Sequence, residues 1–154
     1  MSGVGLTVPK LMPITGTWAG PFAFYYCLLS CRVVNQRLKT EHYIGDRPPN
    51  STCEPGYDPL ETESRAQGNF IENVPLAFIL LGVAELNGGN RKALHYVMAA
   101  LFALRVAHVE GGLRLKGKFG GGGVGRPVGF FGTVGVLGGL GGYASYLVKE
   151  YWGF

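Results

Sequence analysis

The chain has 154 residues, of which 47% are hydrophobic and 16% charged, with a formal net charge of +4. Soluble globular domains carry roughly 25% charged residues, so the composition argues against that class, and the length favours one domain. The basic residues flank apolar segments and form no separate patch, so we expect no nucleic-acid partner. The histidines and cysteines lack zinc-ligand spacing, and we expect no metal site.

Two long apolar segments occupy the first half of the chain. The first, Leu11 to Cys31, contains no charged residue. As a helix it is about 30 Å long, enough to cross the hydrocarbon core of a bilayer. The second covers about residues 61–87, and Glu72 is the one charged residue near its middle. A polar, basic stretch separates the two segments.

The second half of the chain repeats this pattern after the tight turn at residues 87–90. Because the turn is short, we expect the third helix, residues 91–114, to be the antiparallel neighbour of the second. A basic, glycine-rich loop follows at residues 115–126. The fourth segment is uncharged, and its pairs Gly135/Gly139 and Gly138/Gly142 have the GxxxG spacing that lets helices approach closely in lipid.

These patterns predict an all-α integral membrane protein, a four-helix bundle forming a single domain over residues 1–154. The expected spans are residues 11–38, 61–87, 91–114 and 126–149. Ten basic residues flank the first and third loops, against four on the other side. This bias predicts that both longer loops face the cytosol and that both termini lie on the far side.

The second helix carries a polar stripe within its apolar sequence. Arg65, Asn69 and Glu72 follow at i, i+4 and i+7 and therefore share one helix face. Arg105 and His108 form a second stripe at similar depth on the third helix. Ionisable groups in a spanning helix face a partner or a wet cavity. The stripes therefore indicate either an internal network that locks the bundle, such as Glu72 with Arg105, or a basic cavity for an anionic ligand with an amine.

The second-helix run Arg65-x-Gln67-x-Asn69-x-x-Glu72-x-x-Pro75 resembles the signature of the MAPEG family, the membrane-associated proteins of eicosanoid and glutathione metabolism. The pair Arg105-x-x-His108 is similar to the third-helix motif of that family, and Arg32-Val33 to the end of its first helix. The four spans also match, so the resemblance covers nearly the whole chain. His108 and Asn73 stand where the eicosanoid enzymes of the family have tyrosines.

The resemblance implies a homotrimer that binds glutathione between subunits near the cytosolic edge. Arg65, Gln67 and Asn69 would hold the peptide and its carboxylates, and Glu72 the γ-glutamyl ammonium. Arg126, at the entrance to the fourth helix, would be catalytic, because a cation beside the thiol favours the thiolate. The same resemblance adds further glutathione-binding candidates, namely Arg32, Arg105 and His108.

The expected function is therefore that of a microsomal glutathione transferase-like enzyme. It would conjugate glutathione to an apolar electrophile, or reduce a lipid hydroperoxide, that arrives from the bilayer. The alternative is a non-catalytic trimeric membrane protein that binds lipid, glutathione or a partner. The expected location is the endoplasmic reticulum, with the mitochondrial outer membrane as the other possibility.

Overall fold

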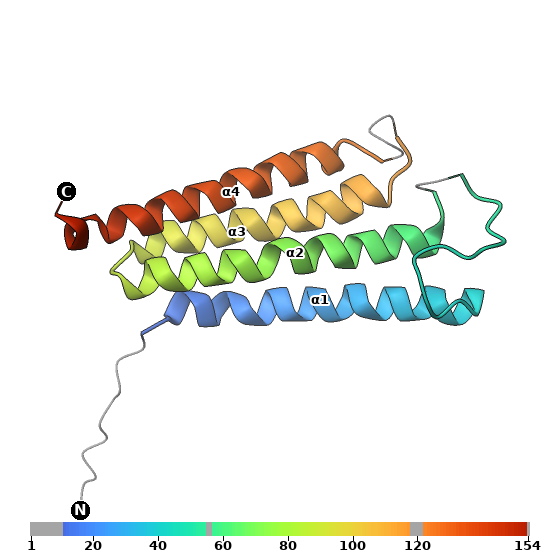
Figure 1. The fold of residues 1–154 in the computed structure, drawn as a ribbon, viewed down its shortest axis with the longest axis horizontal. Helices are drawn as coiled ribbons and strands as arrows, with labels where there is room; N and C mark the ends of the chain where they lie inside the picture. The colour runs from blue at the N-terminus through green and yellow to red at the C-terminus, as the bar shows by residue number, and fades with distance from the viewer. Residues whose placement is uncertain (1–10, 55–56, 118–121, 154) are drawn as a thin grey trace, which may run out of the picture.

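The computed structural model describes residues 11–54, 57–117 and 122–153, and all regular elements of these residues are helical. Four helices lie side by side, α1 next to α2 and α3 next to α4 (Figure 1). The third helix continues into a π-helical turn, η1, and the fourth into a 3-10 turn, η2. The elements are α1 (Pro13–Thr40), α2 (Pro59–Leu86), α3 (Arg91–His108), η1 (Val109–Leu113), α4 (Gly125–Leu147) and η2 (Lys149–Trp152).

The connections divide between the two ends of the bundle. The start of α1, the α2–α3 turn and the end of α4 lie at one end, and both longer connections lie at the other (Figure 1). The predicted spans differ from the helix bounds by at most two residues when η1 is counted with α3. Part of the predicted basic loop, residues 118–121, lies outside the described residues.

Local signals explain where α2 and α3 begin. Asp58 accepts hydrogen bonds from the main-chain N–H groups of Leu60 (2.9 Å) and Glu61 (3.2 Å), and Pro59 occupies the first helical position. Burial alone would raise the pKa of Asp58. The hydrogen bond from the Ser51 hydroxyl and those from the main chain outweigh burial and lower it. Asn90 caps α3 in the same way.

The first turn of α1 receives its cap from α2. Both carboxylate oxygens of Glu85 accept hydrogen bonds from the start of α1, from the N–H groups of Ile14 (2.7 Å) and Thr15 (2.9 Å) and from the Thr15 hydroxyl (2.8 Å). These are donors that a helix start leaves without an intrahelical partner. Glu85 is 5% exposed, so the cap is a buried contact between the two helices.

Aromatic side chains hold α1 to α2 and α3. The ring of Phe22 lies 5.2 Å from the rings of both Phe78 on α2 and Phe102 on α3, edge to face in each case. Fully buried aliphatic side chains, including Leu29, Leu81 and Leu101, complete this core. Leu140 and Ala144 of α4 are buried in the same core, so all four helices contribute to it.

Glycines on α4 pack directly against the α3 backbone. A Cβ added to Gly129 would overlap His108 Cβ and lie 2.7 Å from the Leu104 carbonyl oxygen, and one added to Gly132 would lie 2.5 Å from the Leu104 side chain. By contrast, a Cβ added to the predicted GxxxG glycines would meet nothing within 4 Å: this holds for Gly135, Gly138, Gly139 and Gly142. Within the protomer, α4 therefore packs through other glycines than the predicted pairs, which stay on its surface.

Among the residues that the structure describes, three helical segments are long and apolar enough to cross a membrane: Pro59–Leu86, Arg91–Leu113 and Gly125–Leu147. α1 is as long as α2 but less apolar. Apolar side chains such as Ile79 and Phe131, 63% and 70% exposed, cover the outside of the bundle. Four crossings, with α1 as the fourth, remain a prediction.

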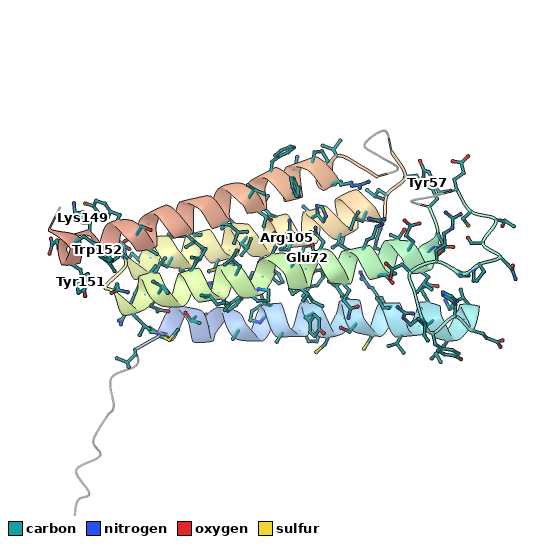
Figure 2. All side chains as sticks on the ribbon, in the orientation of Figure 1. Tyr57, Glu72, Arg105, Lys149, Tyr151 and Trp152 are labelled. Atoms are coloured by element: carbon teal, nitrogen blue, oxygen red, sulfur yellow. The ribbon has the colours of Figure 1, made fainter. Side chains whose placement is uncertain are left out.

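The end of α4 carries exposed aromatic residues. Tyr151 and Trp152 are 84% and 69% exposed, and the ammonium of Lys149 lies 4.2 Å from the centre of the Tyr146 ring (Figure 2). Tyrosine and tryptophan side chains of this kind concentrate where a spanning helix meets the lipid headgroups. The position of η2 agrees with a membrane boundary at this end of the bundle.

Candidate functional site

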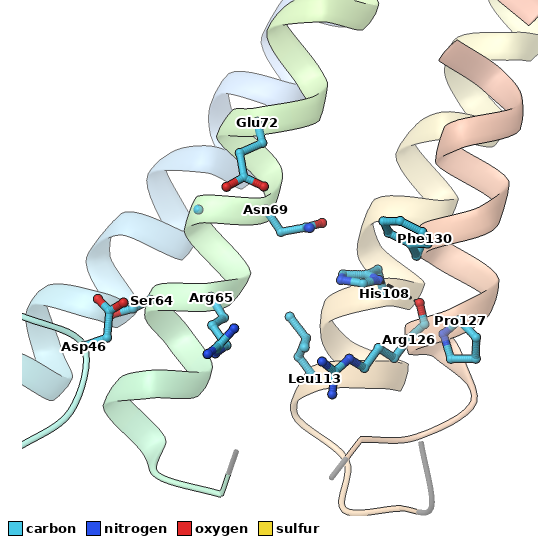
Figure 3. Close-up of a pocket in the computed structure, with 11 residues that line it drawn as sticks. Asp46, Ser64, Arg65, Asn69, Glu72, His108, Leu113, Arg126, Pro127 and Phe130 are labelled. Carbon is cyan, nitrogen blue, oxygen red and sulfur yellow. Dashed lines mark hydrogen bonds between the residues drawn. The ribbon is translucent and has the colours of Figure 1, made fainter. Parts of the chain in front are cut away.

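A cavity of about 710 Å³ opens at the end of the bundle that holds the longer connections. Its walls come from α2 on one side and from the α3–η1 segment and the start of α4 on the other (Figure 3). Five of the predicted site residues line it: Arg65, Asn69, Glu72, His108 and Arg126. The remaining lining residues, which the sequence did not single out, are Asp46, Ser64, Gly68, Leu113, Pro127 and Phe130.

The α2 wall presents opposite charges one above the other (Figure 3). The Arg65 side chain is 61% exposed, and its Nε donates to Glu61 Oε1 at 3.1 Å. Glu72 lies near the middle of α2 and is exposed in the protomer, without a hydrogen bond or ion pair to any described residue. A carboxylate in a spanning helix faces a polar partner or a wet cavity, and Glu72 lines such a cavity.

Arg105 is placed behind the cavity wall and does not line the cavity. Arg105 is 2% exposed. Its two Nη groups donate hydrogen bonds to Asn69 Oδ1 and to the Gly129 carbonyl oxygen, each at 2.6 Å. The suggested pairing of Arg105 with Glu72 is therefore wrong. Arg105 ties α3 to α2 and α4, and it occupies the acceptor end of the Asn69 amide. The amide N–H groups are then the donors that remain for a ligand.

His108 links α3 to the start of α4. Its Nδ1 lies 3.0 Å from the main-chain oxygen of Arg126, and the residue is 4% exposed (Figure 3). The close approach depends on glycine, because a Cβ added to Gly112 in η1 would lie 2.8 Å from the Cα of Arg126. The π-helical turn and this contact together set where Arg126 enters the cavity wall.

Two predicted ligands of glutathione, Arg32 and Gln67, lie outside this cavity. The Nη1 of Arg32 is 2.5 Å from Glu110 Oε1, and Gln67 Nε2 donates to the Ser30 hydroxyl at 2.8 Å. Gln67 is two residues from both Arg65 and Asn69, so it projects from the opposite side of α2. Neither side chain reaches the cavity of its own protomer.

Glu110 is the centre of an ion network that the sequence reasoning did not assign. Besides Arg32, it accepts from Arg114 at 3.0 Å and from the Tyr25 hydroxyl at 3.3 Å, and Arg114 reaches Glu63 at 3.3 Å. The network joins α1, α2 and η1. The signal for it was present in the sequence, because an acid within a spanning helix needs a cationic partner.

The connection between α1 and α2 brings one further acid to the cavity. Asp46 lines its mouth near Ser64 (Figure 3). The loop is held by Arg37, which donates to the Gly45 carbonyl oxygen at 3.0 Å, and Gly45 has a φ of +88°. The Ser64 hydroxyl oxygen is buried and has no hydrogen-bond partner among the described residues.

The lining is suited to an organic zwitterion. The described residues contain no cluster of three or more histidine, cysteine or acidic side chains that could hold a metal ion. Two guanidinium groups, two carboxylates, an imidazole and an amide surround the cavity, and Leu113, Pro127 and Phe130 supply an apolar wall. Such an arrangement can bind carboxylates and an ammonium group at the same time.

Comparison with known proteins agrees with the resemblance seen in the sequence. A search of curated proteins finds no significant match. The family model of the MAPEG family matches residues 15–146, which include α2, α3, η1 and all but the last residue of α4. The family includes glutathione transferases and related proteins of eicosanoid metabolism. Together with three apolar helices long enough to span a bilayer, this match shows that the chain is a multi-pass membrane protein belonging to the MAPEG family.

Proposed function

We propose that this protein is a membrane-bound glutathione transferase-like enzyme that joins glutathione to apolar electrophiles or reduces lipid hydroperoxides. The observation that carries the proposal is the Glu72 carboxylate, in the middle of a helix long and apolar enough to span a bilayer. It has no hydrogen-bond or ion-pair partner among the described residues, and it shares one cavity with Arg65 and Arg126. Glutathione has one ammonium group, two carboxylates and a thiol. The cavity offers a counterpart for each of these groups.

The roles follow from the charges. Glu72 receives the γ-glutamyl ammonium, and the guanidinium of Arg65 and the amide of Asn69 bind carboxylate and peptide groups. Arg126 lies on the opposite wall and faces the thiol, where its charge favours the thiolate. Arg105 contributes indirectly by holding Asn69.

The homotrimer that the resemblance implies would account for the residues outside the cavity. Glu72 is exposed in the protomer, and a neighbouring protomer would cover it. Gln67 projects from the other side of α2, where it donates to Ser30 of α1, so a role in binding glutathione would need a cavity that a second copy contributes. The surface glycines Gly138 and Gly142 would let a helix of another protomer approach α4 closely. Gly138→Leu with Gly142→Leu is then expected to disrupt the trimer in native mass spectrometry.

The second substrate is expected to come from the lipid phase. Leu113, Pro127 and Phe130 form an apolar wall on the α4 side, and Phe130 is 45% exposed. A cavity of about 710 Å³ is within the range of sites that hold drug-sized ligands, so it has room for a tripeptide and part of an electrophile. We expect the protein in the endoplasmic reticulum or the mitochondrial outer membrane, with this cavity on the cytosolic side.

Calorimetric titration of glutathione into the detergent-purified protein tests the binding half of the proposal. The catalytic half is tested with a chloronitrobenzene electrophile and a lipid hydroperoxide. Arg126→Ala is expected to keep most of the affinity for glutathione, to lower turnover at neutral pH and to recover part of it at higher pH. Glu150→Gln, in η2 at the far end of the bundle, is the matched control.

A non-catalytic binding protein is the alternative, and one observation favours it. Arg32 and Arg105, two of the expected glutathione ligands, are engaged inside the protomer with Glu110, Asn69 and Gly129. Absence of a thiolate absorbance band when glutathione binds to the wild-type protein would support this alternative. Absence of glutathione binding would refute the proposed function.

A further inference from the structure

We propose that Nε2 of His108 is the base that removes the proton from the thiol bound in the cavity. The inference rests on the proposed function and extends it, because it assigns a catalytic role where the family resemblance assigns only binding. It starts from the hydrogen bond between His108 and the main-chain oxygen of Arg126.

This hydrogen bond determines the tautomer of the ring. A carbonyl oxygen can only accept, so the proton between the two atoms belongs to Nδ1 of His108. In the neutral imidazole the lone pair is then on Nε2. Nε2 has no hydrogen-bond partner among the described residues, and His108 lines the cavity. Figure 3 shows the ring edge opposite the Arg126 bond pointing into the cleft.

The ring is also held in this orientation. His108 is 4% exposed, and its Cβ lies against Gly129, where no side chain could be accommodated. The hydrogen bond to the start of α4 fixes rotation about the last side-chain bond. A base held at one position between two helices loses little further conformational entropy when it acts on a bound thiol.

The other charged groups of the cavity cannot replace it. Arg126 on α4 and Arg65 on α2 are guanidinium cations, which have no lone pair to accept a proton. Arg105, one turn earlier on α3, is bonded to Asn69 and Gly129. Of the two cavity acids, Glu72 is expected to hold the ammonium. Asp46 is across the cleft from His108, at the mouth (Figure 3).

Transfer of the thiol proton to His108 needs no reactant besides glutathione and the electrophile. The thiol S–H bond breaks, its electron pair stays on sulfur, and the proton forms a bond to Nε2. Arg126 stabilises the thiolate, which attacks the electrophile. The imidazolium then gives its proton to the leaving group, or to the carbon or oxygen anion that addition creates, and the neutral ring is restored.

The His108→Asn variant distinguishes a role of His108 as a base from a purely structural role of its hydrogen bond to Arg126. The asparagine amide N–H takes the place of Nδ1–H and can still donate to the Arg126 carbonyl, but nothing replaces the lone pair of Nε2. General-base catalysis contributes about 10²–10⁴-fold. We therefore expect turnover at neutral pH to fall at least about a hundredfold in His108→Asn, with the calorimetric affinity for glutathione changed by less than about threefold. Turnover should rise again at higher pH, and added imidazole should restore part of it.

Proton release provides a readout that a structural role would not change. In the wild type we expect the thiolate absorbance to appear when glutathione binds. The number of protons released to a pH indicator in weak buffer should be smaller than the number of thiolates formed, because His108 keeps part of the protons. In His108→Asn, at a pH where the thiolate forms, one proton should be released for each thiolate. His108→Leu, which loses both nitrogens, is the comparison for loss of the Arg126 contact.

Three results would overturn the inference. The first is wild-type turnover in His108→Asn together with reduced turnover in His108→Leu, because this combination would make His108 a positioning residue. Another is equal proton release in wild type and His108→Asn. The third is a loss of rate in His108→Asn that neither pH nor imidazole recovers. Failure of the proposed function itself is distinguishable, because the wild type would then not bind glutathione in the calorimeter.

Discussion

The packing of α4 on α3 predicts opposite effects for the same substitution at two glycines of one helix. Gly129→Ala places a methyl group against His108 and 2.7 Å from the Leu104 carbonyl oxygen, whereas Gly135→Ala places it where nothing lies within 4 Å. Both substitutions gain about 1 kcal/mol of helix propensity. Their difference therefore isolates the packing cost.

That cost is set by what the new methyl group meets. At Gly129 two of the three nearest atoms are backbone, which cannot rotate away, and overpacking of this kind costs about 1–3 kcal/mol. At about 2–4 °C of melting temperature per kcal/mol, Gly129→Ala should melt several degrees below Gly135→Ala. Gly132→Ala should fall between them, because it meets only the end of the flexible Leu104 side chain.

Melting in detergent can be followed by tryptophan fluorescence, because Trp18 lies in the aromatic core beside Phe22 and Phe102. The oligomeric state of each variant is measured in parallel, so that a change at a subunit contact is not read as a change in the protomer. Equal melting temperatures for Gly129→Ala and Gly135→Ala would show that α3 and α4 are not in backbone contact there.

Three further results are expected. Glu72→Gln should weaken glutathione binding about 10- to 100-fold in calorimetry and leave the melting temperature unchanged, since the carboxylate has no partner among the described residues; a variant that unfolds would make Glu72 structural. Glu85→Gln should cost about 1–3 kcal/mol and speed hydrogen exchange in the first turn of α1, and unchanged exchange would contradict the cap. Asp58→Ala should cost about 1–2 kcal/mol at neutral pH. Because the folded-state pKa of Asp58 is lowered, this stabilisation is complete above the unfolded pKa of about 3.9 and is lost as the pH falls through the folded value; a cost that persists at lower pH would refute it.

The predicted site residues that the structure brings together on one wall of the cavity lie on a single helix. Arg65, Asn69 and Glu72 share a face because of helical periodicity alone, and all three line the cavity. The starts of α2 and α3 also depend on local signals, because Asp58 and Asn90 are residue types that favour the N-cap position.

The parts that could not be predicted depend on how helices are rotated against one another. Arg32 was expected at the glutathione site, but η1 presents Glu110 to it, and a π-helical turn has no sequence signature that periodicity reveals. The same holds for Arg105, whose partners are an amide and a main-chain carbonyl oxygen and not an acid. Glycine spacing also does not tell which glycines face a neighbour inside the protomer.

The Glu85 cap has a consequence for the order in which the protein assembles. The donors at the start of α1 and the carboxylate that satisfies them are separated by 71 positions between Ile14 and Glu85. During synthesis, α1 therefore emerges with bare amides at its first turn and obtains its cap only once α2 is complete. Because α1 is also less apolar than the three segments long and apolar enough to span a bilayer, we expect it to enter the membrane together with α2, as half of a hairpin. The first helix of the chain is thus finished only together with the second.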